Sequence, residues 1–155
     1  RGTSRNRFAK YSEEGAVYQD NMQRLLRKFE TAKTLVPAPV IRGSGAKTGV
    51  IYFGSSSPAM NEAMAALEAQ GLRLDTMRLR AFPFSEAVSD FIEAHDQVFL
   101  VEQNRDAQMR SLLVNECGID PARFLSILHY DGTPITARFI IAAIAERMAR
   151  KEAAE

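Results

Sequence analysis

The sequence has a single cysteine, Cys117, among its 155 residues. One thiol cannot form a disulfide within the chain, and it cannot by itself hold an iron–sulfur cluster or a thiolate zinc site. Cys117 lies one helical turn after Leu113, a position typical of a small core residue. Proteins stapled by disulfides, and metal sites built from this chain's thiols alone, are therefore excluded.

The chain also lacks a charge excess and long apolar runs. It has 20 basic and 19 acidic residues and a formal net charge of +1, so composition gives no reason to expect nucleic acid or a charged membrane as a partner. No apolar run approaches the roughly 18 residues of a membrane span, and no signal peptide is visible. We therefore expect a cytoplasmic protein that binds neither nucleic acid nor a membrane.

Two phosphate-binding motifs are missing as well. The loop 43–49 has a lysine followed by threonine, but an alanine precedes the lysine and a strand, not a helix, follows. The turn after the apolar run 50–53 lacks the glycines of a dinucleotide fingerprint. Its hydroxyls, those of Ser55, Ser56 and Ser57, still offer donors to an anion at a helix start. Capping of that helix by Ser57 is the simpler interpretation.

What the sequence does contain is enough apolar side chains, 46% of residues, for one substantial core. Residues 1–35 are interpreted as a linker and an amphipathic helix from a preceding domain, because they begin without methionine and read like the interior of a longer chain. Residues 36–150 should form an α/β domain, and 151–155 a tail. The apolar positions of the expected first helix are Met22, Leu25, Leu26, Phe29 and Ala32.

Strands alternate with amphipathic helices from residue 36 onward. The runs 50–53 and 98–101 are unbroken and apolar, as strands covered on both faces are. Segment 73–79 alternates apolar and polar residues, which predicts a half-exposed strand nearer the edge. Two prolines in 35–41 exclude a central strand there but allow an edge strand, and 124–128 is the last strand. The pattern predicts a three-layer α/β/α fold with an open, mostly parallel sheet of about five strands.

The expected burial of each strand predicts the strand order. The runs 50–53 and 98–101 should be central neighbours, with the alternating strand outside the first and the last strand outside the second. The order then reverses between the two central strands, and ligands of open α/β sheets bind at such a reversal. We therefore expect a crevice between residues 54–57 and 102–106.

A polar cluster begins where the strand 98–101 ends, and it is richer in polar side chains than a strand-to-helix turn requires. Arg105 and Arg110 offer forked donors to a carboxylate or phosphate, and Asp106 suits a helix cap. In the alternative, Arg105 pairs locally with Glu102 or Asp106 and the cluster is ordinary surface. The candidate ligand or interface residues are Ser55, Ser56, Ser57, Glu102, Asn104, Arg105, Asp106 and Arg110.

The two histidines have simple interpretations. His95 ends a short predicted helix and is expected at the surface. His129 has a carboxylate nearby in Asp131, for which a hydrogen bond at the strand end is the simpler interpretation and an acid/base pair the alternative. Thr133 and Pro134 predict the cap and the first residue of the final helix.

Several segments carry a resemblance to a known family. A strand ends at Phe53–Ser57, a second strand runs into the turn at Met77–Ser85, and a third ends in Glu102. This order resembles the C-terminal domain of transketolase-like thiamine diphosphate enzymes, although Phe84 and Ser85 stand where that family has a Leu-Asp-like pair. Within that group, Val101–Arg110 and His129–Arg138 resemble the alpha subunit of 2-oxoacid:ferredoxin oxidoreductases, nearest to the 2-oxoglutarate type. Residues 18–32 are similar to the segment before this domain.

The resemblance implies oxidative decarboxylation of a 2-oxoacid to an acyl-coenzyme A, with thiamine diphosphate, magnesium, an iron–sulfur cluster and reduction of ferredoxin. This chain lacks the family's Gly-Asp-Gly motif with a downstream asparagine, of which Asp131–Gly132 is only a fragment. We therefore expect no cofactor, metal ligand or catalytic residue here. The expected partners are the remaining alpha-subunit domains and a beta subunit.

Two other functions stay open at this point. One is an independent module that binds a nucleotide or another anion in the crevice between residues 54–57 and 102–106. The other is a structural oligomerisation domain of a different transketolase-like enzyme. A thiamine-enzyme domain in frame upstream of Arg1 would favour the oxidoreductase domain over both.

Overall fold

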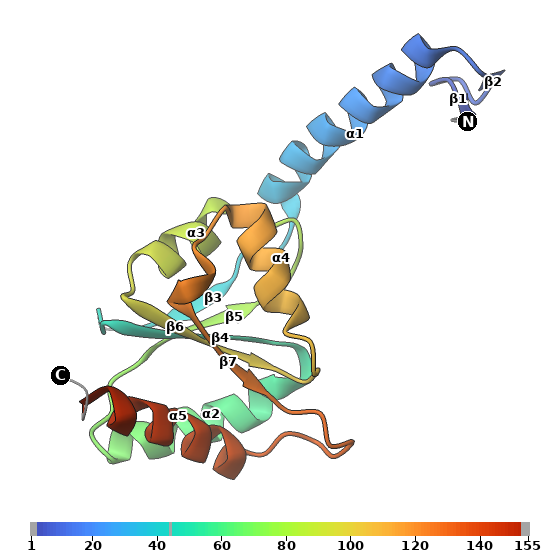
Figure 1. Ribbon diagram of the computed structural model, residues 1–155. Coiled ribbons are helices and arrows are strands. Elements are labelled where there is room, and N and C mark those ends of the chain that lie inside the picture. The colour runs from blue at the N-terminus through green and yellow to red at the C-terminus, as the bar shows by residue number, and fades with distance from the viewer. Residues whose placement is uncertain (1–2, 44, 153–155) are drawn as a thin grey trace. The chain divides into compact units, whose positions relative to one another are not determined.

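A computed structural model of the chain describes residues 3–43 and 45–152. The chain divides into two compact units, Arg1–Val36 and Pro37–Glu155, which we call the N-terminal unit and the sheet domain (Figure 1). Each unit is held by contacts of its own, and each is described by itself.

The N-terminal unit consists of a small hairpin and a long helix. Strand β1 (Ser4–Arg5) pairs antiparallel with β2 (Tyr11–Ser12), and helix α1 (Gly15–Leu35) follows. The Nδ2 of Asn21 in α1 donates hydrogen bonds of 2.9 Å to Ser4 Oγ and 2.7 Å to the Arg5 carbonyl. The expected linker therefore includes a hairpin. The sequence could not predict it, because two-residue strands are too short to show an alternation of apolar and polar residues.

Helix α1 carries an apolar stripe that its own unit leaves uncovered. Tyr18, Met22, Leu25 and Phe29 are spaced by four, three and four residues, as in a heptad seam. Their side chains are 41%, 37%, 46% and 47% exposed. The sequence thus predicted the amphipathic helix, and the side chains of its apolar face are partly exposed.

The sheet domain is built on five strands in the order β3-β5-β4-β6-β7. All neighbours pair in parallel except β3, which is antiparallel to β5 at the edge. The order matches the sequence prediction, with the two apolar runs side by side at the centre. The strands are β3 (Val40–Arg42), β4 (Thr48–Phe53), β5 (Asp75–Leu79), β6 (Gln97–Glu102) and β7 (Phe124–Leu128).

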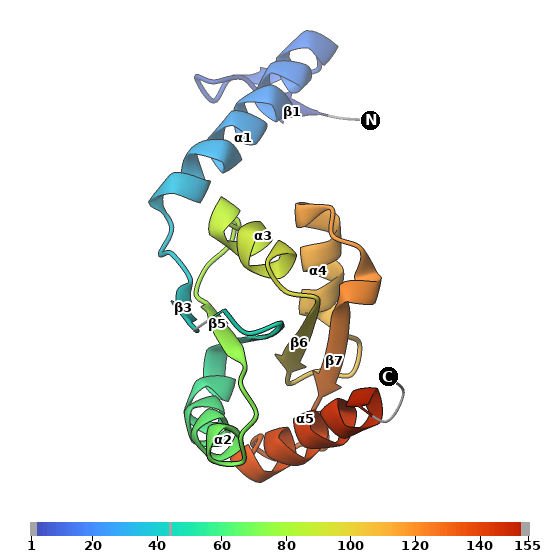
Figure 2. The ribbon, with the colours of Figure 1, turned by 90° about the vertical axis from the view of Figure 1, so that its left-hand side faces the viewer.

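Four helices cover the sheet, two on each face. Helices α2 and α5 lie on one face and α3 and α4 on the other (Figures 1 and 2), which confirms the three-layer α/β/α fold. Of the expected tail, residues 151 and 152 continue α5, and 153–155 lie outside the described residues. The helices are α2 (Ser57–Ala69), α3 (Glu86–Glu93), α4 (Gln108–Cys117) and α5 (Ala137–Glu152), with short 3-10 turns η1 (Gly54–Ser56) and η2 (Pro121–Arg123).

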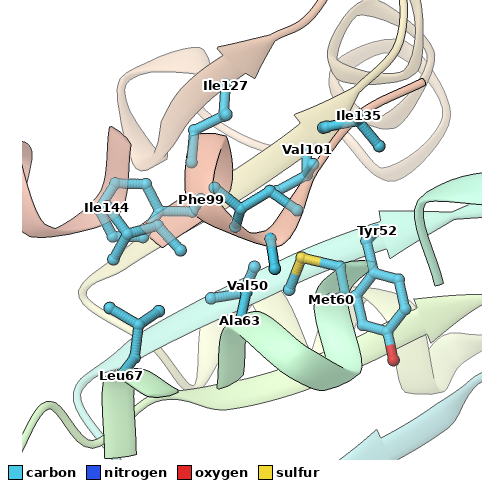
Figure 3. Packing of buried hydrophobic residues seen from close by; sticks show 12 residues of the cluster. Val50, Tyr52, Met60, Ala63, Leu67, Phe99, Val101, Ile127, Ile135 and Ile144 are labelled. Carbon is cyan, nitrogen blue, oxygen red and sulfur yellow. The ribbon is translucent and has the colours of Figure 1, made fainter. Parts of the chain in front are cut away.

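Side chains alternate between the two faces along the central strands and so form two hydrophobic cores, one on each face of the sheet. Val50 and Phe99 point toward α2 and α5, where they pack with Leu67 and Ile144 (Figure 3). The intervening residues, such as Leu100, point the other way and pack under α3 and α4. Both central strands are thus buried on both faces, as an unbroken apolar run predicts.

Strand β5 corrects the expectation of a half-exposed strand. Of its five residues only Arg78 is exposed. The reason is that β3 pairs along its outer side, so β5 is second from the edge. The polar residues that suggested exposure include Asp75, which accepts hydrogen bonds of 3.1 Å from the backbone amides of Gly45 and Ala46.

His95 is buried, and the expectation of a surface histidine was wrong. Its side chain is 4% exposed, with Nδ1 at 2.6 Å from the Phe91 carbonyl and Nε2 at 3.4 Å from Asp75 Oδ2. Gly49 on β4 makes room for this packing, because a Cβ at that position would lie 2.9 Å from the Phe91 ring. The histidine therefore ties the end of α3 to the start of β5.

Candidate functional site

The carboxyl ends of β4 and β6 enclose a crevice where the strand order reverses. Its cavity volume is about 430 Å³, and its lining comes from residues 53–56, Gln103, Asn104 and the first turns of α4. The structure thus places a crevice at the predicted position, outside the carboxyl ends of the two central strands.

The β4 side of the crevice is made by the turn from β4 into α2. Ser56 is 2% exposed and Ser55 is open to solvent. Gln103 Nε2 from the opposite side donates hydrogen bonds of 2.9 Å to Ser55 Oγ and 3.2 Å to Ser56 Oγ. Ser57 is the first residue of α2, not its cap, because the 3-10 turn η1 leads directly into the helix.

Glu102 on the β6 side is fully buried, with 0% of its side chain exposed. Its Oε2 accepts hydrogen bonds of 2.7 Å from the Met109 amide and 2.8 Å from Asn104 Nδ2, and Oε1 accepts one of 3.2 Å from the Arg110 amide. A carboxylate at a helix N-terminus satisfies amides that have no partner within the helix. Glu102 therefore holds α4 against the end of β6.

Asn104 completes the cap that was expected of Asp106. Its Oδ1 accepts hydrogen bonds of 3.1 Å from the Asp106 amide and 3.2 Å from the Gln108 amide. The residue at the N-cap itself, Ala107, has a left-handed backbone with φ of 50° and offers no capping side chain. The prediction of an Asp106 cap was therefore wrong, because the chain makes an extra turn before α4 begins.

The charged residues of the predicted cluster do not line the crevice. Arg105 Nε donates to Asp106 Oδ1 at 2.7 Å, and both side chains are mostly exposed, which matches the local-pair alternative. Arg110 Nη2 donates at 2.9 Å to the Pro121 carbonyl. Arg110 Nε is buried without a hydrogen-bond partner among the described residues.

The structure therefore sorts the candidate residues into groups. Ser55, Ser56 and Asn104 line the crevice, whereas Ser57, Glu102, Arg105, Asp106 and Arg110 do not. Gln103, which sequence reasoning left off the candidates, joins the two sides of the crevice. Strand alternation could have identified Gln103 from the sequence. Gln103 follows Glu102 directly, so the two side chains must point in opposite directions.

The turn after β7 uses its carboxylate for structure. Asp131 Oδ1 accepts hydrogen bonds from Thr133 Oγ1 at 2.7 Å and from the Thr133 amide at 2.8 Å. The hydroxyl bond, followed by the amide bond, holds the pKa of Asp131 below its usual range. His129 Nε2 lies 3.4 Å from the same oxygen. This geometry agrees with the structural interpretation of the pair.

The final helix begins later than the sequence predicted. Helix α5 starts at Ala137, and Thr136 Oγ1 accepts a 3.2 Å hydrogen bond from the Phe139 amide. Thr133 instead belongs to the Asp131 turn. The expected cap at Thr133 was therefore wrong by one short turn, because the loop from His129 makes a tight turn before the helix.

The described residues do not fit the cofactors that the resemblance implies for a full enzyme. Among the described side chains, those of residues 3–43 and 45–150, no group of three His, Cys, Asp or Glu is placed to hold a metal ion. Asp131 is the acidic residue of the partial Gly-Asp-Gly motif, and its Oδ1 already accepts two bonds from Thr133. Cys117, the one cysteine of the sequence, is half-buried.

The fold and the crevice define a class. The domain is a doubly covered, mostly parallel sheet whose central strand ends in a buried glutamate, which is the architecture of a transketolase C-terminal-like domain. A transketolase split between two genes, solved as an inactive beta4 tetramer, is similar over 70% of this chain and 40% of its own, at a TM-score of 0.55 and 16% identity.

Within this class, two structural neighbours are 2-oxoacid:ferredoxin oxidoreductases. The 2-oxoglutarate:ferredoxin oxidoreductase of Magnetococcus marinus, solved with 2-oxoglutarate, coenzyme A and succinyl-CoA, is similar over 92% of this chain at a TM-score of 0.81 and 20% identity. The alpha chain of a probable 2-oxoacid ferredoxin oxidoreductase from Thermoplasma acidophilum is similar over 72% of this chain and 97% of its own, at a TM-score of 0.50 and 25% identity.

The chain spans a quarter of the length of the Magnetococcus marinus protein. No protein-family model matches the chain. No curated protein matches it either. The structural neighbours thus bear out the resemblance that the sequence motifs indicated.

Proposed function

We propose that this chain is a C-terminal domain of the alpha subunit of a 2-oxoacid:ferredoxin oxidoreductase, of the 2-oxoglutarate type. In this proposal the complete cytoplasmic enzyme converts a 2-oxoacid to an acyl-coenzyme A and reduces ferredoxin. The 155-residue chain packs against other parts of the enzyme and is inactive alone.

The observation that carries the proposal is the extent of one structural match. The sheet domain makes up about three quarters of the chain, so a match over 92% must extend into the N-terminal unit. The transketolase match, over 70%, requires no such extension. The long match therefore favours an oxidoreductase subunit over a generic transketolase-like enzyme.

The chemistry of the crevice supports a structural role. The carboxylate of Glu102, buried behind the crevice, accepts three hydrogen bonds, and Gln103 joins the two sides of the crevice. In the proposal, thiamine diphosphate, magnesium, coenzyme A and the iron–sulfur cluster are held by other alpha-subunit domains and by a beta subunit. No step of the reaction is assigned to a residue of this chain.

The apolar stripe of α1 supports contacts with those other domains. Exposed heptad positions pack best against another helix, and Tyr18, Met22 and Leu25 are exposed. The stripe therefore suits a protein partner such as a helix of the preceding alpha-subunit domain. None of the helices in the described ranges is long and apolar enough to cross a membrane.

The proposal is tested by expressing the complete reading frame with its neighbouring subunit gene. We expect coenzyme A-dependent oxidation of 2-oxoglutarate with reduction of ferredoxin, and a faster rate with 2-oxoglutarate than with pyruvate. Faster turnover of another 2-oxoacid would refute the substrate, and no turnover of any 2-oxoacid would refute the enzyme class.

The assignment of the cofactors to other domains has its own test. Calorimetric titration of the 155-residue chain with thiamine diphosphate and magnesium should give no saturable heat. The complete enzyme, titrated in the same buffer, is the positive control. Tight stoichiometric binding by the 155-residue chain would refute the view that the cofactor site lies elsewhere.

A further inference from the structure

A second cavity lies on the α2 side of the sheet, and no lining residue is shared with the crevice. Its volume is about 600 Å³, within the range of pockets that hold small organic molecules. Its polar and charged lining includes Arg42, Tyr52, Asn61, Glu68, Arg73 and Thr76. We call this cavity the edge groove, because it is bounded by the edge strand β3.

Strand register places two arginines on the same face of the sheet, Arg42 in the lining of the groove and Arg78 beside it. Arg42 pairs with Thr76 across β3 and β5, and Arg78 follows two residues after Thr76 on the same strand. Alternation along a strand therefore turns Arg42, Thr76 and Arg78 toward one face. Arg78 also pairs with Tyr52 of β4, whose ring packs in the core beneath α2, so this is the α2 face.

The arrangement concentrates positive charge at the groove. Arg42 and Arg78 are diagonal neighbours on adjacent strands, a relation that spans roughly 7–8 Å between backbones. Arg42, Arg73 and Arg78 are exposed, and across residues 3–43 and 45–152 their guanidinium groups have no hydrogen bond or ion pair. Glu68 is the only acid among the lining residues. A forked donor pair of this kind suits an oxyanion.

The hydroxyl of Tyr52 adds a hydrogen-bond donor to the edge groove. Its side chain is 6% exposed, and its hydroxyl has no hydrogen-bond partner within the described part of the chain. The ring lies at the margin of the apolar cluster, with the hydroxyl oxygen turned away from the packed residues (Figure 3). The groove that Tyr52 lines gives access to this hydroxyl, which can therefore donate a hydrogen bond to a molecule bound there.

We propose that the edge groove binds a small organic oxyanion, a phosphate or carboxylate attached to an apolar body. Arg42 from the lining and Arg78 from beside the groove on the same face hold the oxyanion, and the Tyr52 hydroxyl donates to it. The apolar body rests on Met64, Leu72 and Leu74, which also line the groove. This site goes beyond the oxidoreductase assignment and does not depend on it.

The test uses the 155-residue chain and two matched probes, phenyl phosphate and benzoate, followed by amide chemical shifts. Saturable binding of at least one probe in the millimolar range or tighter is expected, with shifts clustered around Tyr52, Met64 and Thr76. The stronger of the two probes identifies phosphate or carboxylate as the preferred group. Inorganic phosphate, which lacks the apolar body, should bind more weakly than phenyl phosphate. Failure of both probes to saturate by about 10 mM overturns the proposal.

Variants separate a built site from general charge attraction. Arg42→Ala and Arg78→Ala should each weaken binding about tenfold, the effect of losing one charge-assisted pair of bonds. Tyr52→Phe keeps the ring in the core and should weaken binding several-fold with unchanged thermal unfolding. Arg138→Ala removes an exposed arginine of α5 that does not line the groove, and it should leave affinity unchanged. An equal loss in Arg138→Ala overturns the proposal.

Discussion

The two turns that face each other across the crevice differ in how they are held. The β6 turn is fixed from inside by Glu102 and Asn104, which together accept hydrogen bonds from four backbone amides leading into α4. The β4 turn has no capping side chain at the start of α2, and its serines accept bonds only from Gln103 within the described residues.

The difference shows that a run of polar residues can have two roles at once. Within Glu102–Asp106, the buried members are committed to local structure, while the Arg105–Asp106 pair remains at the surface. A partner or ligand can reach the exposed Arg105 and Asp106 and the crevice-lining Gln103 and Asn104, but not the buried Glu102. The functional hypothesis for this cluster therefore narrows to its exposed members and to Gln103.

The largest effect is expected in the strand that supports the β6 turn. Leu100 is fully buried at the centre of the sheet, so Leu100→Ala should lower the free energy of unfolding by about 2–5 kcal/mol. Urea denaturation measures the change. Leu26→Ala in α1, where the side chain is 62% exposed, is the control and should change it by less than about 0.5 kcal/mol. Equal effects would mean that β6 is not the central support.

The next effect separates the two turns directly. Glu102→Ala leaves the Met109 and Arg110 amides without their acceptor and should lower the free energy of unfolding by about 2–3 kcal/mol. Ser57→Ala on the β4 turn should cost less than about 0.5 kcal/mol, because Ser57 has no capping role. Comparable losses in both variants would show that the two turns are held alike.

A smaller effect is expected at the third turn of the same edge, after β7. The pKa of Asp131 is lowered by its bonds from Thr133, so Thr133→Ala should raise that pKa toward the ordinary value. Because the folded-state pKa is the lower one, the stability that Asp131 contributes is complete above the unfolded pKa and is lost as pH falls through the folded pKa. Carboxyl chemical shifts of Asp131 against pH measure both variants, and an unchanged midpoint would contradict the assignment of these bonds.

Apolar periodicity predicted the layers and the strand order well, because burial on both faces leaves a mark on every residue of 50–53 and 98–101. Polar contacts between residues that are distant in sequence leave no comparable pattern in the sequence. His95 was expected at the surface because its helix ends there, yet Asp75, distant in sequence, lies against it. Capping was misassigned at Asp106 and Thr133 because an extra turn before each helix cannot be read from residue preferences.

We propose that the domain serves the complete enzyme through its surfaces, with the exposed Arg105 facing a partner. The most direct measurement compares Arg105→Ala in the 155-residue chain with the same change in the complete enzyme. The account predicts a stability change under about 1 kcal/mol in the 155-residue chain, together with loss of assembly or turnover in the complete enzyme. Unchanged assembly and turnover in the complete enzyme would contradict it and make the Arg105–Asp106 pair ordinary surface.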